Sequence, residues 1–338
     1  MKRIGYALAL AGLAVAIALV ARTGWHSVLD ALATAGWPLL ALVPLRVAPL
    51  ALDSLGWRVL LAPRDAHHRA GWPILLAAAA VRESVNRLLP VAGVGGDVAG
   101  IRLVSGRGLD TTAVAASVII EIVLTMVCLV LFAAFGLAML AAWSHGAASI
   151  DGLLVGILLA LPVPLAGLWL ISEGRLAAWL GRFAVLVIGG SGPAPAWLAS
   201  MPAFEAELSA LARRRGRLAL AALLQLLGMT AGAAEVWLAL RLLGHPVAVV
   251  PALIIESAVL LARNLAFAVP AGLGAQEAGI VLICAALGLG QEAAIGLALA
   301  KRMREVLFGL PVLLGWHLWE SVGGLATLRG RPAGEGRE

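Results

Sequence analysis

The sequence predicts an all-α fold: a polytopic membrane helix bundle with six full spans and two re-entrant, broken-helix hairpins related as inverted repeats. Three observations predict it. The 338 residues are 62% hydrophobic and only 13% charged, with a mean hydropathy of +0.98. Several apolar runs reach the roughly 20 residues that cross a bilayer, and two more are interrupted by proline and glycine. A soluble protein of this length needs more polar surface, so we expect residues 1–320 to form a single membrane domain.

Apolar runs of sufficient length predict the six full spans. They cover residues 4–21, 37–62, 112–142, 150–172, 217–243 and 292–319. The first run follows Met1-Lys2-Arg3 and has no clear small-x-small cleavage site after it. We therefore interpret it as a retained signal anchor rather than a cleaved signal peptide.

The distribution of arginine predicts the orientation. Arginines concentrate in the loops 63–70, 100–111 and 173–216 and in the tail 321–338, whereas the loops near His145 and His245 have almost none. Loops rich in Lys and Arg face the cytoplasm, so both termini are expected inside. Within the loop 173–216, alternating basic and apolar residues predict a helix in the inner interface; a solvated linker is the alternative.

The two broken segments, 71–100 and 246–290, must each return to the membrane face from which they start. The loops 63–70 and 100–111 are both expected inside, so the first segment starts and ends on that face. The loop near His245 is expected outside and the tail inside, so the second segment must return to the outer face before the span 292–319 crosses the membrane. A re-entrant hairpin satisfies the requirement, and so do two ordinary spans. The stretch 277–290 is only 14 residues long, which is too short to cross comfortably, so we favour hairpins.

The broken segments resemble each other. Each runs from an Asn through a Pro and a Gly-rich stretch to a carboxylate seven residues past the proline, which is Asp97 in the first and Glu277 in the second. This predicts an inverted-topology repeat, with copies at about 37–142 and 217–319 and a substrate site between them near the midplane. The predicted helix breaks are Pro90, Gly93, Gly95, Gly96, Pro270, Gly272 and Gly274.

Polar residues inside these apolar segments are candidates for a substrate and translocation route. A charge at the bilayer centre costs at least ~2.5–3.5 kcal/mol on insertion scales, so such charges pair or line a wet cavity. Possible partners on one helix face are Arg46 with Asp53, Glu256 with Arg263, and Lys301 with Glu305; structural ion pairs are the alternative to a functional role. The candidates are Asn86, Asp97, Arg102, Glu121, Glu256, Arg263, Asn264, Glu277, Lys301 and Arg304.

Motifs of soluble enzymes are not found in the sequence. It has no Gly-x-Ser-x-Gly, His-Glu-x-x-His or P-loop pattern. Cys128 and Cys284 lie in separate apolar stretches, which indicates packing rather than a disulfide or a metal site. We expect no catalytic residues, no metal and no cofactor. The net charge of +6 comes from loop arginines, so nucleic acid is not an expected partner.

Four blocks of the chain resemble a known family. They are the Asn86–Asp97 block followed by Arg102 and Gly108, the span that contains Glu121, the Pro270–Glu277 block, and the Lys301–Arg304 cluster. Together they are similar to the flippase-like membrane region of the lysylphosphatidylglycerol synthase family, from about residue 5 to 320. The run LARNLAFAVPAGLGAQEAG is especially similar to the branch associated with hopanoid biosynthesis.

The resemblance implies lipid handling. In lysylphosphatidylglycerol synthases this region moves lipid across the bilayer, and a separate soluble domain makes the lipid. The sequence has no counterpart of that soluble domain, so we expect no aminoacyl transfer. The expected function is a lipid transporter or flippase-like protein of the bacterial inner membrane that moves a hopanoid, another polyisoprenoid lipid or a phospholipid. The alternative is a non-catalytic accessory subunit of a hopanoid pathway, with proteins of that pathway as partners.

Overall fold

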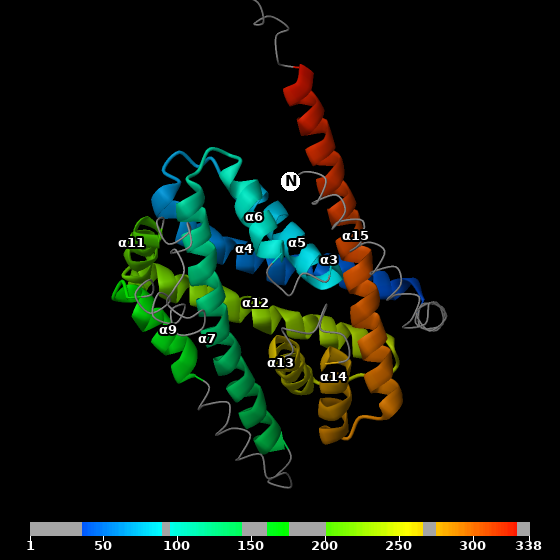
Figure 1. Cartoon of the computed structure of the whole chain (residues 1–338). Coiled ribbons are helices and arrows are strands. Elements are labelled where there is room, and N and C mark those ends of the chain that lie inside the picture. Colours follow the sequence, from blue (N-terminus) through cyan, green and yellow to red (C-terminus); the bar gives the residue numbers. More distant parts are fainter. Residues whose placement is uncertain (1–35, 90–94, 144–160, 176–200, 266–274, 330–338) are drawn as a thin grey trace, which may run out of the picture.

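The computed structural model describes residues 36–89, 95–143, 161–175, 201–265 and 275–329. Within these ranges every regular element is a helix (Figure 1). The predicted first span at 4–21 lies outside the described residues. Of the predicted span at 150–172, the structure describes α9 (Pro162–Ser172). The described part of the chain therefore has the all-helical architecture that the sequence predicts.

Three helical stretches are long and apolar enough to cross a membrane: Trp37–Arg64, Thr111–Trp143 and Arg215–Leu242. The first consists of η1 (Trp37–Ala41), α3 (Leu42–Leu45), α4 (Val47–Leu61) and η2 (Ala62–Arg64), and the others are α7 (Thr111–Trp143) and α12 (Arg215–Leu242). They match the spans predicted at 37–62, 112–142 and 217–243. Their outer faces expose large apolar side chains such as Phe135 and Leu223, as expected where a helix meets lipid.

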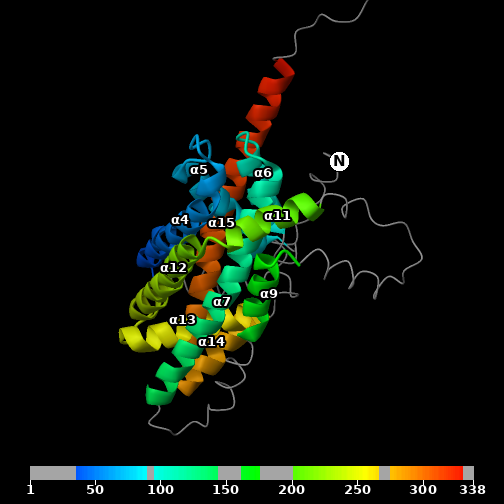
Figure 2. The ribbon, with the colours of Figure 1, turned by 90° about the vertical axis from the view of Figure 1, so that its left-hand side faces the viewer.

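The last helix, α15 (Gln291–Arg329), is longer than the predicted span at 292–319. It remains helical through Pro311 and extends beyond the rest of the bundle at its C-terminal end (Figures 1 and 2). Its first half carries Lys301, Arg302, Arg304 and Glu305, three of which are almost fully buried. Four charges within five residues distinguish α15 from the three apolar stretches, in which charged residues are more widely spaced.

Each broken segment forms two short helices that pack together. The first pair is α5 (Trp72–Leu88) and α6 (Gly95–Ser105), and the second is α13 (Val249–Leu265) and α14 (Ala275–Ala286). At 1.5 Å per residue, α6 and α14 are only about 16–18 Å long, well short of the ~30 Å hydrocarbon core. The second helix of each pair is thus too short to cross the core, and the re-entrant hairpins stay a prediction.

Of the predicted helix breaks, Gly95 and Gly96 lie in the described residues, and α6 begins there. Gly96 is pressed against α5, since an added Cβ would overlap the carbonyl oxygen of Arg82. Its N–H donates to Asn86 Oδ1 at 2.8 Å. The other predicted breaks, Pro90, Gly93, Pro270, Gly272 and Gly274, lie outside the described residues.

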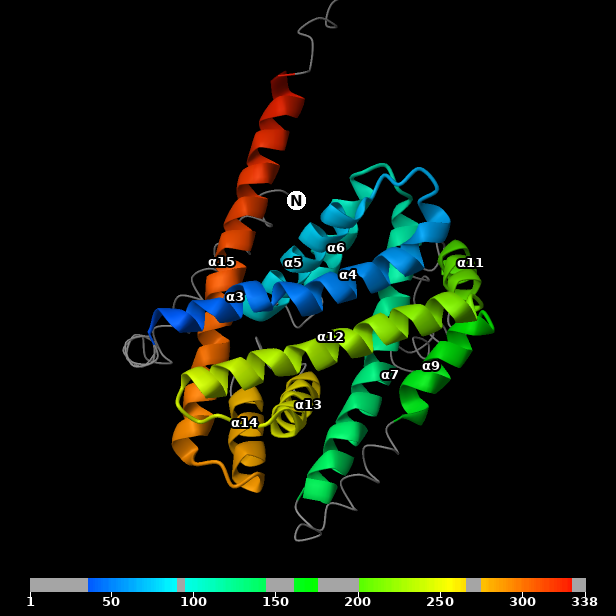
Figure 3. The same ribbon diagram turned by 180° about the vertical axis from the view of Figure 1, so that it is seen from behind.

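The same order of elements occurs twice: a long helix, two short helices, and a long helix. The first set is the Trp37–Arg64 stretch that contains α4, followed by α5, α6 and α7, and the second is α12, α13, α14 and α15. The two leading helices lie side by side (Figure 3) and antiparallel, because Gly56 approaches Ala221 whereas Gly228 approaches Pro49. The first short helix of each set also packs against the last helix of the other set, α5 on α15 and α13 on α7. The residues that meet in the bundle interior therefore come from both sets.

Part of the predicted interfacial loop 173–216 is helical. Its described portion includes α11 (Met201–Ala212), which packs against α7 and α9 through Leu208 and Leu211. Arg64 of η2 forms an ion pair with Glu207 of α11 at 2.8 Å. The amphipathic stretch on which the helix prediction depends, at about 175–187, lies almost entirely outside the described residues, so that helix stays a prediction.

Candidate functional site

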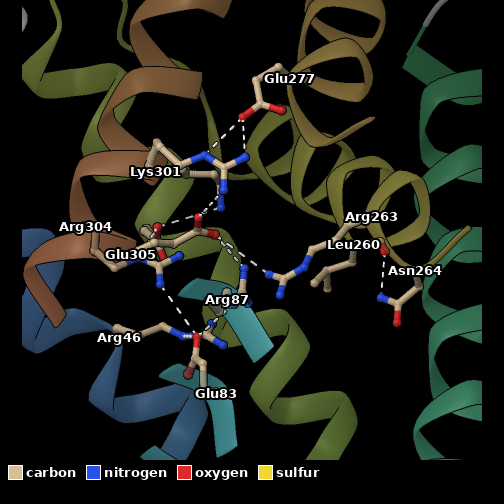
Figure 4. Close-up of polar contacts among 12 residues, drawn as sticks. Arg46, Glu83, Arg87, Leu260, Arg263, Asn264, Glu277, Lys301, Arg304 and Glu305 are labelled. Atoms are coloured by element: carbon tan, nitrogen blue, oxygen red, sulfur yellow. Dashed lines mark hydrogen bonds and ion pairs between the residues drawn. The ribbon is translucent and has the colours of Figure 1, made fainter. Parts of the chain in front are cut away.

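Charged side chains from α5, α12, α13, α14 and α15, together with one from the α3–α4 junction, converge in the bundle interior (Figure 4). Every member forms at least one ion pair with another. We name this set the central charge cluster. Its members are Arg46, Glu83, Arg87, Glu235, Glu256, Arg263, Glu277, Lys301, Arg302, Arg304 and Glu305.

Glu83 of α5 collects three arginines. Arg46 Nε donates to Glu83 Oε1 at 2.8 Å, and Arg87, one turn further along α5, approaches the same oxygen at 3.2 Å. Arg304 of α15 lies 3.6 Å from it. Glu83 Oε2 is buried and has no hydrogen-bond partner among the described residues. Glu83 thus joins the first set of helices to α15 through one oxygen.

Glu305 of α15 has the most buried side chain of the cluster's five carboxylates, only 1% exposed. It accepts from Arg87 Nη1 at 2.7 Å and from Arg302 Nη1 at 3.0 Å. Arg263 Nη1 lies 3.8 Å away, beyond hydrogen-bond distance. Arg302 also donates to Glu277 at 2.6 Å, so it connects α14 to the buried centre.

A third group lies between α12, α13 and α15. Lys301 Nζ donates to Glu256 Oε2 at 2.8 Å, and Arg304 Nε donates to Glu235 Oε1 at 3.0 Å. A Cβ on Gly232 would lie 2.7 Å from Glu256 Oε1. Glycine at this position of α12 therefore gives the Glu256 carboxylate the room that it needs to reach Lys301.

The central charge cluster contains six cations and five carboxylates, so it has one excess positive charge when all are ionised. Arg263 is its most weakly held cation. Its Nη1 is buried without a hydrogen-bond partner among the described residues, and 3.8 Å is its shortest ion-pair distance. The neighbouring segment 266–274 contains no ionisable side chain.

A second group of charges, which we name the Arg82 cluster, consists of Arg82, Asp97 and Glu121. Arg82 Nη2 donates to Asp97 Oδ1 and Arg82 Nη1 donates to Glu121 Oε2, both at 2.8 Å. The guanidinium also lies over the Trp57 ring, 4.8 Å from its centroid. This cluster therefore joins α5, α6 and α7 within the first set of helices and has one excess negative charge.

Two predicted site residues lie apart from both clusters. Arg102, near the end of α6, is largely exposed and forms a 3.4 Å ion pair with Glu320 of α15. Together with Arg107 and Trp319 they line a small surface pocket. Asn264 is also exposed, and its Nδ2 donates to the Leu260 carbonyl of its own helix at 2.8 Å (Figure 4).

The comparison with protein families decides the class of this membrane protein. A family model described as the lysylphosphatidylglycerol synthase TM region matches residues 4–315. The chain belongs to this family. The searches of curated proteins and of solved structures give no match. The family resemblance found in the sequence is thereby confirmed, whereas the hopanoid-associated branch stays a prediction.

The match to the lysylphosphatidylglycerol synthase TM region covers both charge clusters and both pairs of short helices. Half of the ten predicted site residues meet in the central charge cluster: Glu256, Arg263, Glu277, Lys301 and Arg304. Asp97 and Glu121 belong to the Arg82 cluster, and Asn86 holds the start of α6. Asp97 and Glu277, the two matched carboxylates, contact different arginines.

The sequence suggests ion pairs between residues on one face of the same helix, but these residues pair with side chains on neighbouring helices. Arg46 contacts Glu83 rather than Asp53. Glu256 contacts Lys301, and Arg263 approaches Glu305. Side chains seven residues apart on one helix are about 10 Å apart along its axis, so a packed neighbouring helix brings an opposite charge closer.

Seven members of the two clusters are not among the ten predicted site residues. Arg46 and Glu305 are predicted only as ion-pair partners, and the other five are Arg82, Glu83, Arg87, Glu235 and Arg302. Each lies inside an apolar helix, and that position is the signal that would have identified them. Glu83 and Arg87 also have the i, i+4 spacing of a helical ion pair. Among the residues that the structure describes, no group of three or more His, Cys, Asp or Glu is arranged to hold a metal ion.

Proposed function

We propose that this membrane protein is a lipid transporter of the flippase type, without catalytic activity, and that it moves a lipid with a phosphate-bearing headgroup. The observation that carries the proposal is the excess positive charge of the central charge cluster, with Arg263 as its loosely held cation. The family description, a lysylphosphatidylglycerol synthase membrane region, supports lipids as the substrate class.

The charge excess favours a bound anion over a purely structural cluster. Buried charges are tolerated in a membrane protein when they pair with each other, and a structural cluster is best served by equal numbers of both signs. Six cations with five carboxylates leave one positive charge for a ligand. Arginine binds phosphate with its planar set of N–H donors, and Arg263 has a buried donor that finds no partner among the described residues.

The same charge excess favours a phospholipid over a hopanoid or another mainly apolar lipid. A ring system with a small neutral headgroup has no negative charge to bring to Arg263. A phosphate group supplies that charge and several strong acceptor oxygens. Hopanoid transport, which the resemblance to one branch of the family suggests, is therefore the second choice of substrate.

An inverted repeat supports transport rather than a static role. In such proteins the substrate site lies at the interface between the repeats, and one repeat moves against the other. The antiparallel α4 and α12, and the exchange in which α5 packs on α15 while α13 packs on α7, are contacts that a two-fold relation in the membrane plane would generate. The residue pair Glu-Ser also recurs, at Glu83-Ser84 and Glu256-Ser257.

The proposed location is the bacterial inner membrane, with the arginine-rich loops 63–70, 100–111 and 173–216 in the cytoplasm. The alternative function is an accessory subunit of a hopanoid pathway that assembles with lipid-modifying enzymes. Such a subunit would use the same apolar helices but would have no need for a cation without a close partner. Deletion would then lower synthesis of the lipid, whereas loss of a transporter would alter only its distribution between leaflets.

Reconstitution tests the proposal directly. The full chain is placed in vesicles with fluorescent phosphatidylglycerol, and the labelled lipid that remains accessible to an external quencher is measured over time. We expect Arg263→Gln to slow translocation at least severalfold. The matched control is Arg241→Gln, because Arg241 stacks on Trp237 outside both clusters. Equal rates for Arg263→Gln and the unmodified protein, or equal rates for phosphatidylglycerol and a neutral diacylglycerol probe, would refute it.

A further inference from the structure

One carboxylate in the bundle interior belongs to neither cluster. Asp53 lies in α4, on the face that packs against α12, and its Oδ1 is 3.0 Å from the position that a Cβ on Gly228 would occupy. No described side chain forms an ion pair with it, although ion pairs surround it on α5 and α7. The glycine in α12 leaves room for the carboxyl group without giving it a counter-charge.

The balance of charges assigns a protonation state to Asp53. The central charge cluster and the Arg82 cluster together contain seven cations and seven carboxylates. The positive excess of the first equals the negative excess of the second. An ionised Asp53 would add an eighth carboxylate, and no described cation, the loosely held Arg263 included, forms an ion pair with it. An unpaired charge inside a membrane helix bundle is strongly unfavourable, whereas a neutral carboxylic acid avoids this cost.

The charged side chains near Asp53 lie at the start of α4, on α5 and on α7. Both cations among them already form ion pairs with other carboxylates. Arg46, at the start of α4, and Arg82, on α5, hold other carboxylates at 2.8 Å. Glu83 on α5 and Glu121 on α7 are negative and oppose ionisation of Asp53. The titratable or charged groups around Asp53 are Arg46, Arg82, Glu83, Glu121 and Cys128.

The facing surface of α12 also contains a hydrogen-bond acceptor to which no described group donates. Gln225 lies one turn before Gly228 on α12 and is almost fully buried. Its Nε2 donates to Thr125 Oγ1 at 2.9 Å, but its Oε1 is buried without any partner among the described residues. A protonated Asp53 offers an O–H donor on the helix that packs against this surface, whereas an ionised Asp53 offers none.

We propose that Asp53 is a proton-binding site between α4 and α12, occupied by a proton at neutral pH. The site lies where the leading helices of the two helix sets meet, so the proton is held between the halves of the molecule. A sodium ion is a poorer ligand for this site, because a metal cation needs several oxygen ligands and, among the described residues, Asp53 belongs to no group of three or more His, Cys, Asp or Glu side chains that could hold one. The assignment does not depend on the proposed lipid transport.

Labelling with dicyclohexylcarbodiimide tests the site in the unmodified full chain. This apolar reagent reacts with protonated carboxyl groups: the acid adds across a C=N bond, and the O-acylisourea rearranges to a stable N-acylurea. Peptide mass spectrometry then locates the adduct. We expect an adduct on Asp53 at neutral pH, severalfold above that on Glu83 or Glu235, and falling as the pH rises. Adducts on other buried carboxyls with Asp53 unmodified would overturn the proposal, and so would protection by sodium but not by potassium.

Infrared spectroscopy detects the protonated carboxyl group directly, without requiring a carbodiimide molecule to reach Asp53. A protonated carboxyl has a C=O stretch that is well separated from the carboxylate bands. The full chain at neutral pH is expected to show this band, with a shift in deuterium oxide, and Asp53→Asn is expected to lose it. Asp110→Asn is the matched control, because Asp110 is an exposed residue that accepts from Ala113 N at the start of α7. If the band is absent from the unmodified chain, or persists in Asp53→Asn, Asp53 is not the site.

Discussion

Arg87 of α5 donates a 2.7 Å hydrogen bond to Glu305 of α15, across 218 residues of sequence. Both side chains are largely buried. The ion pair joins the first pair of short helices to the final helix, and α5 packs directly against α15. Charge pairing in the bundle interior therefore connects the two sets of helices as well as stabilising each set.

Glu305→Gln should destabilise the protein strongly. The change leaves Arg87, Arg302 and Arg263 with one carboxylate fewer in a buried setting, and breaking a buried pair in this way typically costs about 3–5 kcal/mol. Thermal unfolding of the purified protein in detergent measures the effect. Glu320→Gln is the control, because its ion pair with the exposed Arg102 is long at 3.4 Å and should contribute at most about 1 kcal/mol. Similar unfolding temperatures for the two variants would contradict the prediction.

Asp53→Asn should have the opposite outcome and leave the unfolding temperature nearly unchanged. Asparagine has the size of the protonated aspartate and, like it, carries no charge, so the balance of seven cations and seven carboxylates is preserved. The measurement is the same thermal unfolding, compared with Glu305→Gln. A large loss of stability in Asp53→Asn would mean that Asp53 compensates a cation in the folded protein.

Asp97→Asn and Glu277→Gln should insert and accumulate normally yet reduce lipid translocation. Arg82 keeps its 2.8 Å contact with Glu121 in the first variant, and Arg302 keeps its 3.0 Å contact with Glu305 in the second. The fold therefore retains a partner for each arginine, while the proposed polar route loses one charge. Membrane content by immunoblot and translocation in vesicles are measured together. Failure of either variant to accumulate would identify that carboxylate as structural.

Gly136→Ala should disrupt the contact between α7 and α13. An added Cβ at Gly136 would overlap the Ser257 hydroxyl and lie 2.6 Å from Ser257 Cβ, so the helices must separate. We expect a lower unfolding temperature, with partial recovery in the double variant Gly136→Ala/Ser257→Gly. Gly167→Ala in α9 is the control, because nothing lies within 4 Å of its added Cβ. An unchanged unfolding temperature for Gly136→Ala would show that the helices are less closely packed there.

Single cysteines test the orientation. In a background without Cys128 and Cys284, His67→Cys and Ala248→Cys should react with a membrane-impermeant reagent from opposite sides, because the loop at 63–70 contains two arginines and the loop at 244–248 contains no Lys or Arg. Both positions are exposed. Labelling from intact cells and from inverted vesicles separates the two sides. Reaction of both cysteines in intact cells would exclude the predicted topology.

The sequence determines where the long helices of this protein lie. An uninterrupted apolar run must satisfy its backbone hydrogen bonds within itself in a membrane, so its length alone predicts a helix. The spans predicted at 112–142 and 217–243 correspond to α7 and α12 within one or two residues at each end. Proline and glycine likewise mark the interruption before α6, which begins at Gly95. These are local properties, and each can be found within one segment.

Only the tertiary structure decides which charges meet. Lys301, Arg304 and Glu305 are visible in the sequence as buried charges on one helix, but their partners lie on α5, α12 and α13. Asp53 and Glu83 have the same chemistry and similar apolar surroundings in sequence, yet Glu83 collects three arginines and Asp53 has none. The physical reason is that ion pairing depends on a few ångströms between side chains, and helix packing sets those distances across stretches of up to 218 residues.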